Sequence, residues 1–291
     1  MPRAKRHHVV PKRYLKLFAN QDGRLRGMRR NGPTFITSTV NAAVETDFYT
    51  VTDADAQQLD VVETTLASWE SQLFPGLEAI LGGEWPPQEH TRERAALWMA
   101  LQHLRTRTMR ELSRNIGTTI VEQELDQASR AARVASLVRQ HPEASGEEVS
   151  MLVDETFDGV AENLRDYTAS ASFHAEGIDR HVHVVADEFL RRRWVLMRLQ
   201  RKALITSDNP VALHRDAPVS FGVRTAIGIT FPISRRLGLF LRDGPGQDQV
   251  LPGTTRAANA FNRGTIATAH SSVYWHPADD ALTGVVPLQS P

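Results

Sequence analysis

The chain contains no cysteine. This absence excludes disulfide bonds, thiolate metal sites and cysteine nucleophiles, and it fits a reducing compartment. No run of about 18 apolar residues occurs, so no transmembrane helix is expected. The basic N-terminus also lacks the apolar segment of a secretory signal. We therefore expect a cytoplasmic protein with no membrane partner.

Sequence motifs of several common enzyme classes are also missing. The chain has no Gly-x-Gly-x-x-Gly after a predicted strand, no Walker phosphate loop, no His-Glu-x-x-His and no Gly-x-Ser-x-Gly. Such motifs mark bound nucleotide cofactors, catalytic zinc and nucleophilic serine. The sequence therefore supports none of the common nucleotide cofactors, and any chemistry must rest on other side chains.

What the chain does contain is enough apolar material for a folded core. It has 291 residues, of which 41% are hydrophobic and 23% are charged. These fractions are typical of a globular protein with a sizeable core. One large domain and two closely packed lobes are both consistent with this length.

Charge is balanced overall but unevenly distributed along the chain. Residues 1–30 hold ten Lys or Arg and one acid, whereas residues 31–91 hold ten acids and neither Lys nor Arg. Either the two segments neutralise each other, or the basic segment contacts nucleic acid. Arginine, which forms planar contacts with phosphate and carboxylate, supplies 30 of the 34 basic residues, although coding bias would give the same count.

Residue patterns in the first two thirds predict short strands followed by helices. Residues 24–29 and 35–38 are predicted to form a β-hairpin, with a further short strand at 48–51. The middle of the chain has apolar residues at every third or fourth position, which is typical of amphipathic helices. The predicted helices span residues 59–80, 91–112, 118–140 and 146–168.

The last third of the chain is predicted to form a sheet. The predicted strands are residues 194–199, 203–207, 227–232, 237–241 and 273–275, with a short helix at 255–262. A tight turn at 201–202 is expected to join the first two strands. Segregated strands and helices favour an α+β fold. We expect one α+β domain over residues 1–291, with short strands in 1–52, a central bundle of about four to five helices in 53–192 and a largely antiparallel sheet in 193–291.

Several short motifs resemble those of one known family. Residues 7–18 read HHVVPKRYLKLF, which resembles the HHYVPxFYLxxF-like opening of an uncharacterised, mostly bacterial family named DUF4238. Further matches are FY at 48–49, QHLRT at 102–106, ITSDNPV at 205–211 and FPIS at 231–234. Val9 stands where this family usually has an aromatic residue. The resemblance implies no established reaction, so the chemistry must be argued from the residues.

His7 and His8 are the first candidates for chemistry. An imidazole can serve as a metal ligand or as a general base near neutral pH. Adjacent residues of a strand point to opposite faces, so we expect one of the two to face a site and the other to anchor the segment. The alternative is one structural and one exposed histidine. Arg13, in the same basic segment, is a candidate for substrate binding.

Two predicted helices carry polar groups beside their apolar faces. Glu63 and Glu70 lie two turns apart on one side of the first helix, about 10 Å apart along its axis. They are candidates for metal ligands or, alternatively, part of a solvated helix edge. Gln102 and Arg105 share a face of the next helix, where an unpaired polar group is costly. Arg105 is expected either to pair with one of these glutamates or, with Gln102, to contact a phosphate or carboxylate ligand.

The segment Ser207-Asp208-Asn209-Pro210 follows a predicted strand. A carboxylate and an amide just beyond a strand end are well placed for a site. Asp208 is the best single carboxylate, as a catalytic group or as a ligand for Mg²⁺ or Mn²⁺, and Asn209 is a candidate for binding substrate. The alternative is a turn in which both side chains bond to local backbone. Asn262, on the predicted short helix, is a further candidate for ligand binding.

These candidates lead to three hypotheses of function. The first is a hydrolytic enzyme, most concretely a metal-dependent nuclease or phosphodiesterase of a toxin-like or defence-like kind. Asp208 with Glu63 or Glu70 would hold a divalent cation, one N-terminal histidine would act as base, and Arg105 would stabilise phosphate charge. The second is a non-catalytic module that binds nucleic acid or protein through the arginine-rich N-terminus. The third is a metal-independent enzyme that acts on a small metabolite or peptide through a His–Asp pair.

Overall fold

A computed structural model of the chain describes residues 6–46, 48–49, 51–52, 58–59, 61–124, 127–215 and 222–285. The chain divides into two units, each with its own internal contacts. The first unit comprises Met1–Met109 with Ile178–Pro291, and the second comprises Arg110–Gly177. The expectation of a single domain stays a prediction.

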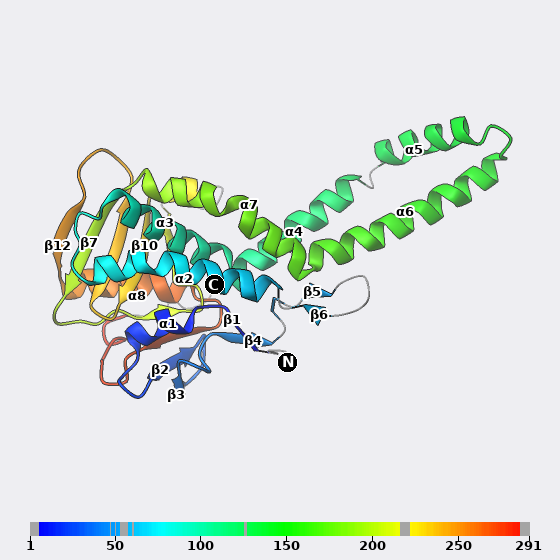
Figure 1. The fold of residues 1–291 in the computed structure, drawn as a ribbon. Helices are drawn as coiled ribbons and strands as arrows, with labels where there is room; N and C mark the ends of the chain where they lie inside the picture. Colours follow the sequence, from blue (N-terminus) through cyan, green and yellow to red (C-terminus); the bar gives the residue numbers. More distant parts are fainter. Residues whose placement is uncertain are drawn as a thin grey trace. The chain divides into compact units, whose positions relative to one another are not determined.

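The order of the elements confirms the predicted α+β class, with short strands first, helices in the middle and a sheet-rich last third (Figure 1). The helices are α1 (Lys12–Leu15), α2 (Val61–Leu81), α3 (Glu89–Leu104), α4 (Arg107–Glu124), α5 (Gln127–Gln140), α6 (Gly146–Ala169), α7 (Ala171–Leu190) and α8 (Thr255–Thr268). In the described part of the chain, none of them is both long enough and apolar enough to cross a membrane.

The strands are β1 (Arg6–His8), β2 (Arg24–Arg29), β3 (Thr34–Ser38), β4 (Val44–Thr46), β5 (Val51–Thr52), β6 (Gln58–Leu59), β7 (Arg193–Leu199), β8 (Thr206–Ser207), β9 (Ala212–His214), β10 (Gly228–Ser234), β11 (Leu237–Arg242), β12 (Gln249–Gly253) and β13 (Ser272–Trp275). Two short antiparallel pairs, β1 with β4 and β5 with β6, stand apart from the larger sheets.

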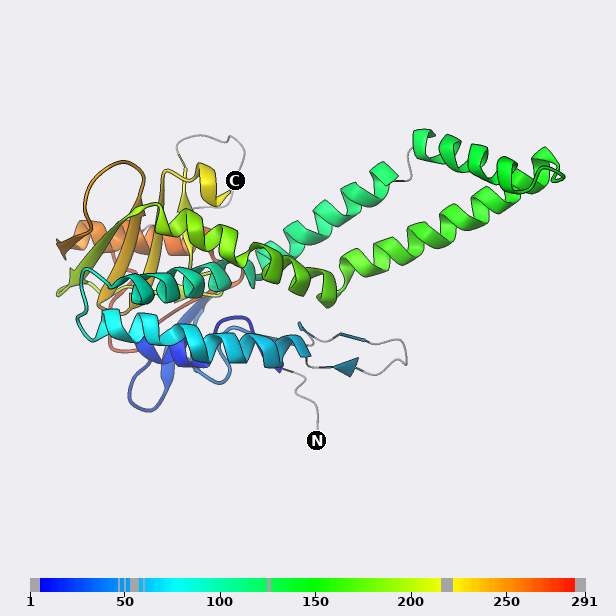
Figure 2. The ribbon, with the colours of Figure 1, turned by 45° about the horizontal axis from the view of Figure 1, so that its top comes forward.

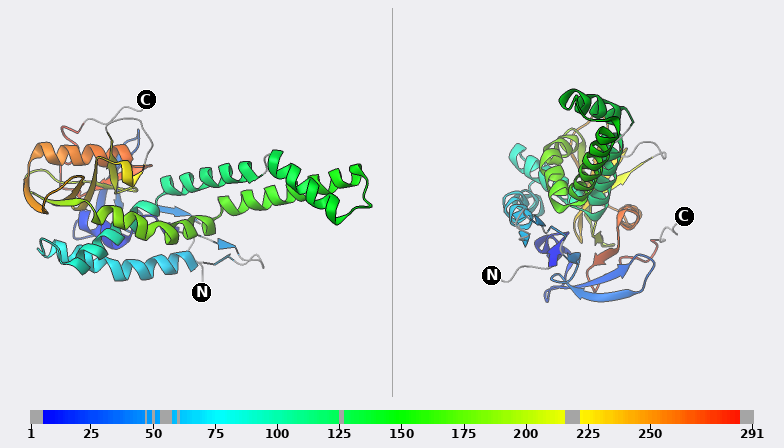
Figure 3. Two further views of the ribbon diagram at one scale, coloured as in Figure 1. Left: turned by 90° about the horizontal axis from the view of Figure 1, so that it is seen from above. Right: turned by 90° about the vertical axis from the view of Figure 1, so that its right-hand side faces the viewer.

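A five-stranded sheet with the order β12-β7-β11-β10-β9 lies at the centre of the first unit. Its pairs are antiparallel except β12 with β7, which confirms the prediction of a largely antiparallel sheet. Helix α8 covers one face, where Phe261 packs against Gly238. Helices α3 and α7 cover the other face (Figure 3). There the indole of Trp194 donates to the carbonyl of Phe189 and lies 4.4 Å from the guanidinium of Arg92.

A second, four-stranded sheet joins the two ends of the chain. Its order is β3-β2-β13-β8, so the predicted N-terminal hairpin, which is confirmed, pairs with a C-terminal strand. The predicted strand at 203–207 is wrong for its first half, and it does not form a hairpin with β7. Only β8 is a strand, and it pairs with β13. The backbone N–H of Ile205 bonds to the side chain of Asn262 instead of to a strand.

The helix predicted over residues 91–112 is two helices. The side chain of Thr106 donates to the carbonyl of His103 at 2.9 Å and accepts the N–H of Met109 at 3.3 Å. It therefore closes α3 and begins α4, because a threonine side chain can replace backbone partners at a helix start. The helix predicted over 118–140 corresponds to the end of α4 and the whole of α5, and residues 125–126 between them lie outside the described residues.

Within the second unit, α5 and α6 lie side by side as a helical hairpin (Figure 2). Leu137, Val149 and Val153 form a small core between them. Ser145 caps α6, because its side chain accepts the N–H of Glu148 and the Glu148 carboxylate accepts the N–H of Ser145. This reciprocal capping confirms the helix start predicted from the sequence.

Candidate functional site

His7 anchors strand β1 to the body of the first unit. Its imidazole is fully buried, and Nδ1 accepts a hydrogen bond of 2.9 Å from the backbone N–H of Tyr49. The other ring nitrogen, Nε2, lies 3.2 Å from Oε2 of Glu63. Phe48 and Tyr49 lie in a turn, so the strand predicted at 48–51 is wrong at these two residues. His7 has partners at both nitrogens and is the anchoring member of the histidine pair.

Arg105 is the centre of a second set of buried contacts. Its guanidinium donates to the carbonyl of His8 at 2.7 Å and to the hydroxyl of Tyr49 at 3.2 Å, and it forms an ion pair with Glu70. Burial disfavours the charge, but Tyr49 and Glu70 outweigh burial and raise the pKa of Arg105 above its ordinary value. The structure therefore confirms the pairing alternative for Arg105, and each of its three nitrogens has a protein partner.

His8 is the member of the pair that remains available for chemistry. Its ring is partly buried, and Nδ1 has no hydrogen-bond partner in the described part of the chain. Burial, followed by the positive charge of Arg105, lowers the pKa of His8 below its ordinary value. The imidazole is therefore neutral at pH 7, which is the form that accepts a proton. A catalytic role for His8 stays a prediction.

Asp208 holds the start of strand β13 through its carboxylate. Oδ1 accepts the N–H of His270 at 2.8 Å, while Oδ2 accepts the N–H of Ser271 at 2.7 Å and that of Ser272 at 3.0 Å. The hydroxyl of Ser271 also donates to Oδ2. The carboxylate thus bonds to backbone, as the structural alternative predicted, although the backbone is distant in sequence and not local.

Asn209 and Asn262 are also bound to backbone groups. The side-chain amide of Asn209 donates to the carbonyl of Thr268 at 3.0 Å. Asn262 is fully buried, and its oxygen accepts the N–H of Ile205 while its nitrogen donates to two further carbonyls. Ligand binding by Asn262 would therefore require the release of one of these partners.

Gln102 and Arg13 lie in opposite surroundings. Gln102 is fully buried, and its amide makes no hydrogen bond to the described residues. Arg13 lies at the surface, where it donates to Glu78 at 3.1 Å and lies 3.8 Å from the ring centre of Phe74. Neither of these predicted substrate-binding residues lines a pocket with Asp208.

The carboxylates predicted to hold a metal do not form one cluster. Glu63 contacts His7, Glu70 pairs with Arg105, and Asp208 bonds to the backbone of β13. Across the ranges that the structure describes, no group of three or more His, Asp or Glu side chains is arranged to hold a metal ion. The geometry of these residues therefore gives no support to the metal-dependent form of the hydrolase hypothesis.

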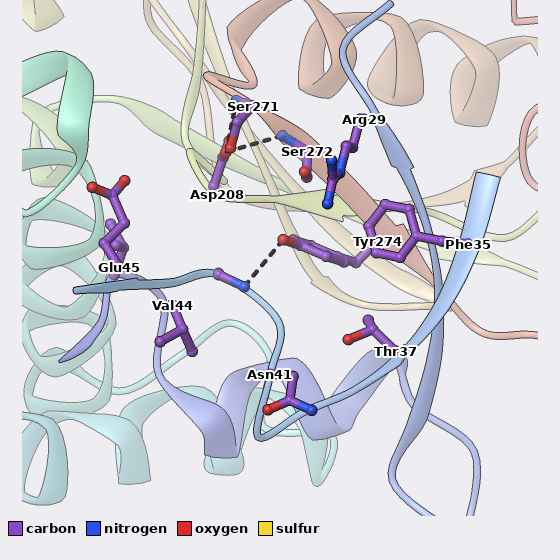
Figure 4. Close-up of a pocket in the computed structure, with 12 residues that line it drawn as sticks. Arg29, Phe35, Thr37, Asn41, Val44, Glu45, Asp208, Ser271, Ser272 and Tyr274 are labelled. Atoms are coloured by element: carbon purple, nitrogen blue, oxygen red, sulfur yellow. Dashed lines mark hydrogen bonds between the residues drawn. The ribbon is translucent and has the colours of Figure 1, made fainter. Parts of the chain in front are cut away.

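A pocket of about 540 Å³ opens beside Asp208 (Figure 4). This volume lies within the range of small-molecule sites. One wall is a face of the four-stranded sheet, and the rest comes from the chain around β4, from Val9 and from the start of β13. The lining residues are Val9, Arg29, Phe35, Thr37, Asn41, Ala43, Val44, Glu45, Asp208, Ser271, Ser272 and Tyr274.

Strand register explains why the sheet residues share one face of the pocket. Arg29 lies opposite Ser272, and Gly27 lies between Phe35 on one neighbouring strand and Tyr274 on the other. A side chain at Gly27 would come within 2.7 Å of the Phe35 ring. The glycine thus lets this ring lie across the strand and meet Tyr274 edge-on, with ring centres 6.5 Å apart. The pocket therefore has an aromatic wall.

Arg29 places a positive charge in this wall. Figure 4 shows its side chain beside Tyr274, and its guanidinium carbon lies 5.9 Å from the ring centre of Phe35. No ion pair of Arg29 occurs within the described ranges. Arg24 and Arg26 lie on the opposite face of β2, because side chains alternate along a strand. Arg29 is therefore the arginine of this strand that faces the pocket.

The opposite wall is held by the hydroxyl of Tyr274. This hydroxyl accepts the backbone N–H of Ala43 at 3.0 Å. Burial raises the pKa of Tyr274 above its ordinary value, so the hydroxyl keeps its proton at neutral pH. Ala43 has φ +49°, which is uncommon for a residue other than glycine. Close by, Oε2 of Glu45 lies 3.7 Å from the guanidinium of Arg107.

Four lining residues of the pocket were not predicted as site residues: Arg29, Phe35, Glu45 and Tyr274. Alternation within the predicted hairpin was the signal that could have placed Arg29 and Phe35 on one face. Tyr274 joins them only because β2 pairs with β13, and no local pattern encodes a pairing between the two ends of the chain.

A comparison with known protein families finds one match. The chain matches the family described as Protein of unknown function (DUF4238) over residues 6–279. It belongs to the DUF4238 family. Three of the sequence motifs that resemble those of this family meet at Tyr14, whose buried hydroxyl donates to the carbonyl of Pro232 and accepts the hydroxyl of Thr206. No curated protein and no solved structure matches the chain.

His103, a buried histidine of α3, makes folding stability depend on pH. Burial lowers the pKa of His103 to about 4, against about 6.5 in an unfolded chain. Between these values the unfolded state binds the proton and the folded state does not, so stability is full above about pH 6.5 and falls as the pH decreases. At pH 5 we expect roughly 2 kcal/mol less stability from this group than at pH 7, as measured by urea unfolding.

The matched control is His103→Leu, which fills a similar volume and cannot titrate. Between pH 7 and pH 5 its stability should fall by roughly 2 kcal/mol less than that of the natural chain. Burial also lowers the pKa of His8, His214 and His276, but these residues are present in both proteins. An equal pH dependence of the two proteins would contradict the assignment to His103.

Proposed function

We propose that this chain binds a phosphate-bearing ligand, most concretely a nucleotide or a single strand of nucleic acid, in the pocket beside Asp208. The observation that carries the proposal is Arg29, which faces the pocket next to the aromatic wall of Phe35 and Tyr274. A guanidinium matches the oxygens of phosphate, and aromatic side chains support bases by stacking.

Polar groups around Arg29 supply further hydrogen bonds to a ligand. The hydroxyls of Thr37 and Ser272 line the same pocket. Asn41, also in the lining, accepts a hydrogen bond of 3.1 Å from Arg6, so a second guanidinium lies beside the pocket. The basic N-terminal segment seen in the sequence thus contributes two arginines to one place.

The negative charge of Asp208 does not exclude an anionic ligand. Three backbone N–H groups and the hydroxyl of Ser271 converge on its carboxylate. These donors offset the charge locally, since hydrogen bonds to an ionised group are stronger than those between neutral groups. Asp208 in this proposal shapes the pocket and does not contact phosphate.

Cleavage of the bound ligand is a second candidate function, and the observation that favours it is His8. This histidine is neutral, and although it does not itself line the pocket, it directly precedes Val9, which does. A neutral imidazole can accept the proton of an attacking water or hydroxyl. The candidate keeps the nuclease or phosphodiesterase activity expected from the sequence, without the predicted metal ligands.

Replacing Arg29 with glutamine should weaken binding of mononucleotides and single-stranded oligonucleotides by roughly 10- to 150-fold, as expected for loss of a charged hydrogen-bonding group. Titration calorimetry with nucleotides and fluorescence anisotropy with labelled oligonucleotides measure this loss. Binding to the natural chain should also weaken as salt rises, because phosphate contacts release counterions.

The matched control is Arg24→Gln, on the same strand but on its opposite face. This variant should bind nearly as well as the natural chain. Equal losses in the two variants would show that general charge, and not the pocket, attracts the ligand. A natural chain that binds none of these ligands would overturn the proposal.

The same samples test cleavage. RNA and DNA are incubated with the protein in EDTA, Mg²⁺ or Mn²⁺, and the products are separated on a gel. Cleavage in EDTA that His8→Gln abolishes would support the second candidate. Binding without cleavage would contradict the second candidate and leave ligand binding as the function. Cleavage only in the presence of metal would support the hypothesis of a metal-dependent hydrolase instead.

A further inference from the structure

We infer that helix α5 packs against α6 of a second copy of this chain, so that the two α5–α6 hairpins form a four-helix bundle. The observation that carries the inference is an apolar stripe at the surface of α5. Its residues recur at the spacing of one helix face, and all of them are exposed: Ala131, Val134, Ala135 and Val138. The inference does not depend on the proposed function, because the pocket beside Asp208 belongs to the first unit.

The hairpin itself leaves this apolar stripe uncovered. Of the described side chains of α5, Leu137 alone is buried, in the small core that it forms with two valines of α6. Val134 and Val138, in the stripe, are 36% and 49% exposed. An amphipathic helix normally turns such a stripe towards a core, and a helix of 14 residues draws most of its stability from that packing. The exposed stripe therefore indicates that another helix covers it.

The charges of the two helices identify that covering helix. Residues 127–140, which form α5, hold three arginines and no acid, whereas residues 146–169, which form α6, hold seven acids and one arginine. Two α5 helices side by side would repel each other, while α5 beside α6 of a second copy is attracted. The ion pair of Arg130 with Asp154 already joins the two helices within one copy. The chain thus carries both a basic helix and the acidic helix that suits it.

A four-helix bundle lets both copies use both helices. The two helices of one hairpin lie side by side (Figure 2), and the side chains of facing helices build the core of such a bundle. A two-fold axis makes the contact of α5 with the other copy's α6 twice. Helices of like charge then lie across the diagonal, and the two apolar stripes face the centre beside the small cores. The interface has an apolar centre and a charged rim.

Sedimentation equilibrium of the full chain tests this inference. The natural chain should form a dimer of about twice the 32.5 kDa of one chain. Val138→Lys places a charge in the apolar centre of the bundle, and two-fold symmetry places it there twice. The dissociation constant of the dimer should therefore rise by roughly 100-fold or more. Because Val138 is exposed in a single copy, circular dichroism should show unchanged helix content.

The matched control is Met151→Lys, which adds the same charge elsewhere on the hairpin. Met151 is 67% exposed. It lies two positions after the buried Val149, about 200° around α6, so it points away from the hairpin core. This variant should form dimers as the natural chain does.

A second pair of variants tests whether α6 is the neighbour of α5. Arg133→Glu combined with Arg139→Glu reverses two exposed charges of α5. At low salt this change should weaken the dimer by roughly 10-fold, as expected when several surface charge pairs change sign. Arg133→Lys combined with Arg139→Lys keeps both charges and should leave the dimer nearly unchanged.

Each outcome decides one part of the inference. A natural chain that stays monomeric at every concentration overturns it, and so do equal dissociation constants for Val138→Lys and Met151→Lys. Equal dimerisation of the charge-reversed and the charge-keeping variants overturns α6 as the neighbour. A dimer that is weakened by Val138→Lys and by charge reversal, but not by the two controls, supports the bundle.

Discussion

Replacing Arg105 with glutamine is expected to lower the free energy of unfolding by about 3–5 kcal/mol, the cost of breaking a buried ion pair by removing one partner. The side chain is only 3% exposed. Its loss leaves the carboxylate of Glu70 without its cation, and the carbonyl of His8 without its donor. Urea unfolding at pH 7 measures the change.

The matched control is Arg13→Gln, which breaks an ion pair at the surface. Arg13 and Glu78 are 38% and 53% exposed, and exposed pairs contribute only about 0–1 kcal/mol. The stacking of Arg13 on Phe74 adds about 1 kcal/mol at most. A similar, small loss in both variants would contradict the structural role of Arg105.

A double variant separates the ion pair from the rest of the network. Glu70→Gln added to Arg105→Gln removes the carboxylate that the first change leaves without a partner. The loss of unfolding free energy in the double variant should therefore be smaller than the sum of the losses in the two single variants, because no charge is left without a partner. Losses that simply add would show that Arg105 and Glu70 act independently.

Local patterns predict much of the helical part of this fold. The start of α6 follows from Ser145 and Glu148, which satisfy each other's backbone N–H groups. The regular spacing of apolar residues predicts α2, which buries Leu66, Leu77 and Ile80. These helices depend on residues within a few positions of each other, so a local sequence pattern is enough to predict them.

Contacts between distant segments could not be predicted in this way. The strand predicted at 203–207 is right only for its last two residues, which form β8 and pair with β13 and not with the preceding strand β7. The break between α3 and α4 depends on which groups Thr106 bonds, and a threonine in a helical pattern is compatible with either outcome. Sheet partners are chosen by the packing of the whole unit, which a local pattern does not specify.

In the candidate site, too, the sequence predicts which residues matter but not which groups they contact. The sequence marked His7, Arg105 and Asp208 as polar groups in restricted surroundings, and the structure places all three in networks of hydrogen bonds and ion pairs. The sequence could not show that the partners of these three residues are mainly backbone groups and other side chains. One example is the backbone N–H of Tyr49, which donates to His7. Polar residues that hold a fold and polar residues that hold a ligand look alike until their partners are known.

Replacing Asp208 with asparagine is expected to cost roughly 2–4 kcal/mol of folding free energy, because hydrogen bonds to an ionised group contribute more than neutral ones. Asparagine keeps one acceptor oxygen. Its amino group, however, turns a donor towards the N–H groups of residues 270–272, which now converge on the carboxylate. At least one of these donors therefore loses its acceptor. Urea unfolding in EDTA measures the loss without any metal.

The sign of this change separates the two roles considered for Asp208. A ligand in an empty metal site is surrounded by like charges, so removing its charge would relieve repulsion and stabilise the metal-free protein. An anchor of β13 gives the opposite result, a clear loss. Ser271→Ala, the matched control, removes only the hydroxyl donor and should cost about 0.5–1.5 kcal/mol. If Asp208→Asn is more stable than the natural chain in EDTA, the anchoring role is wrong and the metal ligand predicted from the sequence returns, because an anchor cannot be removed without a loss.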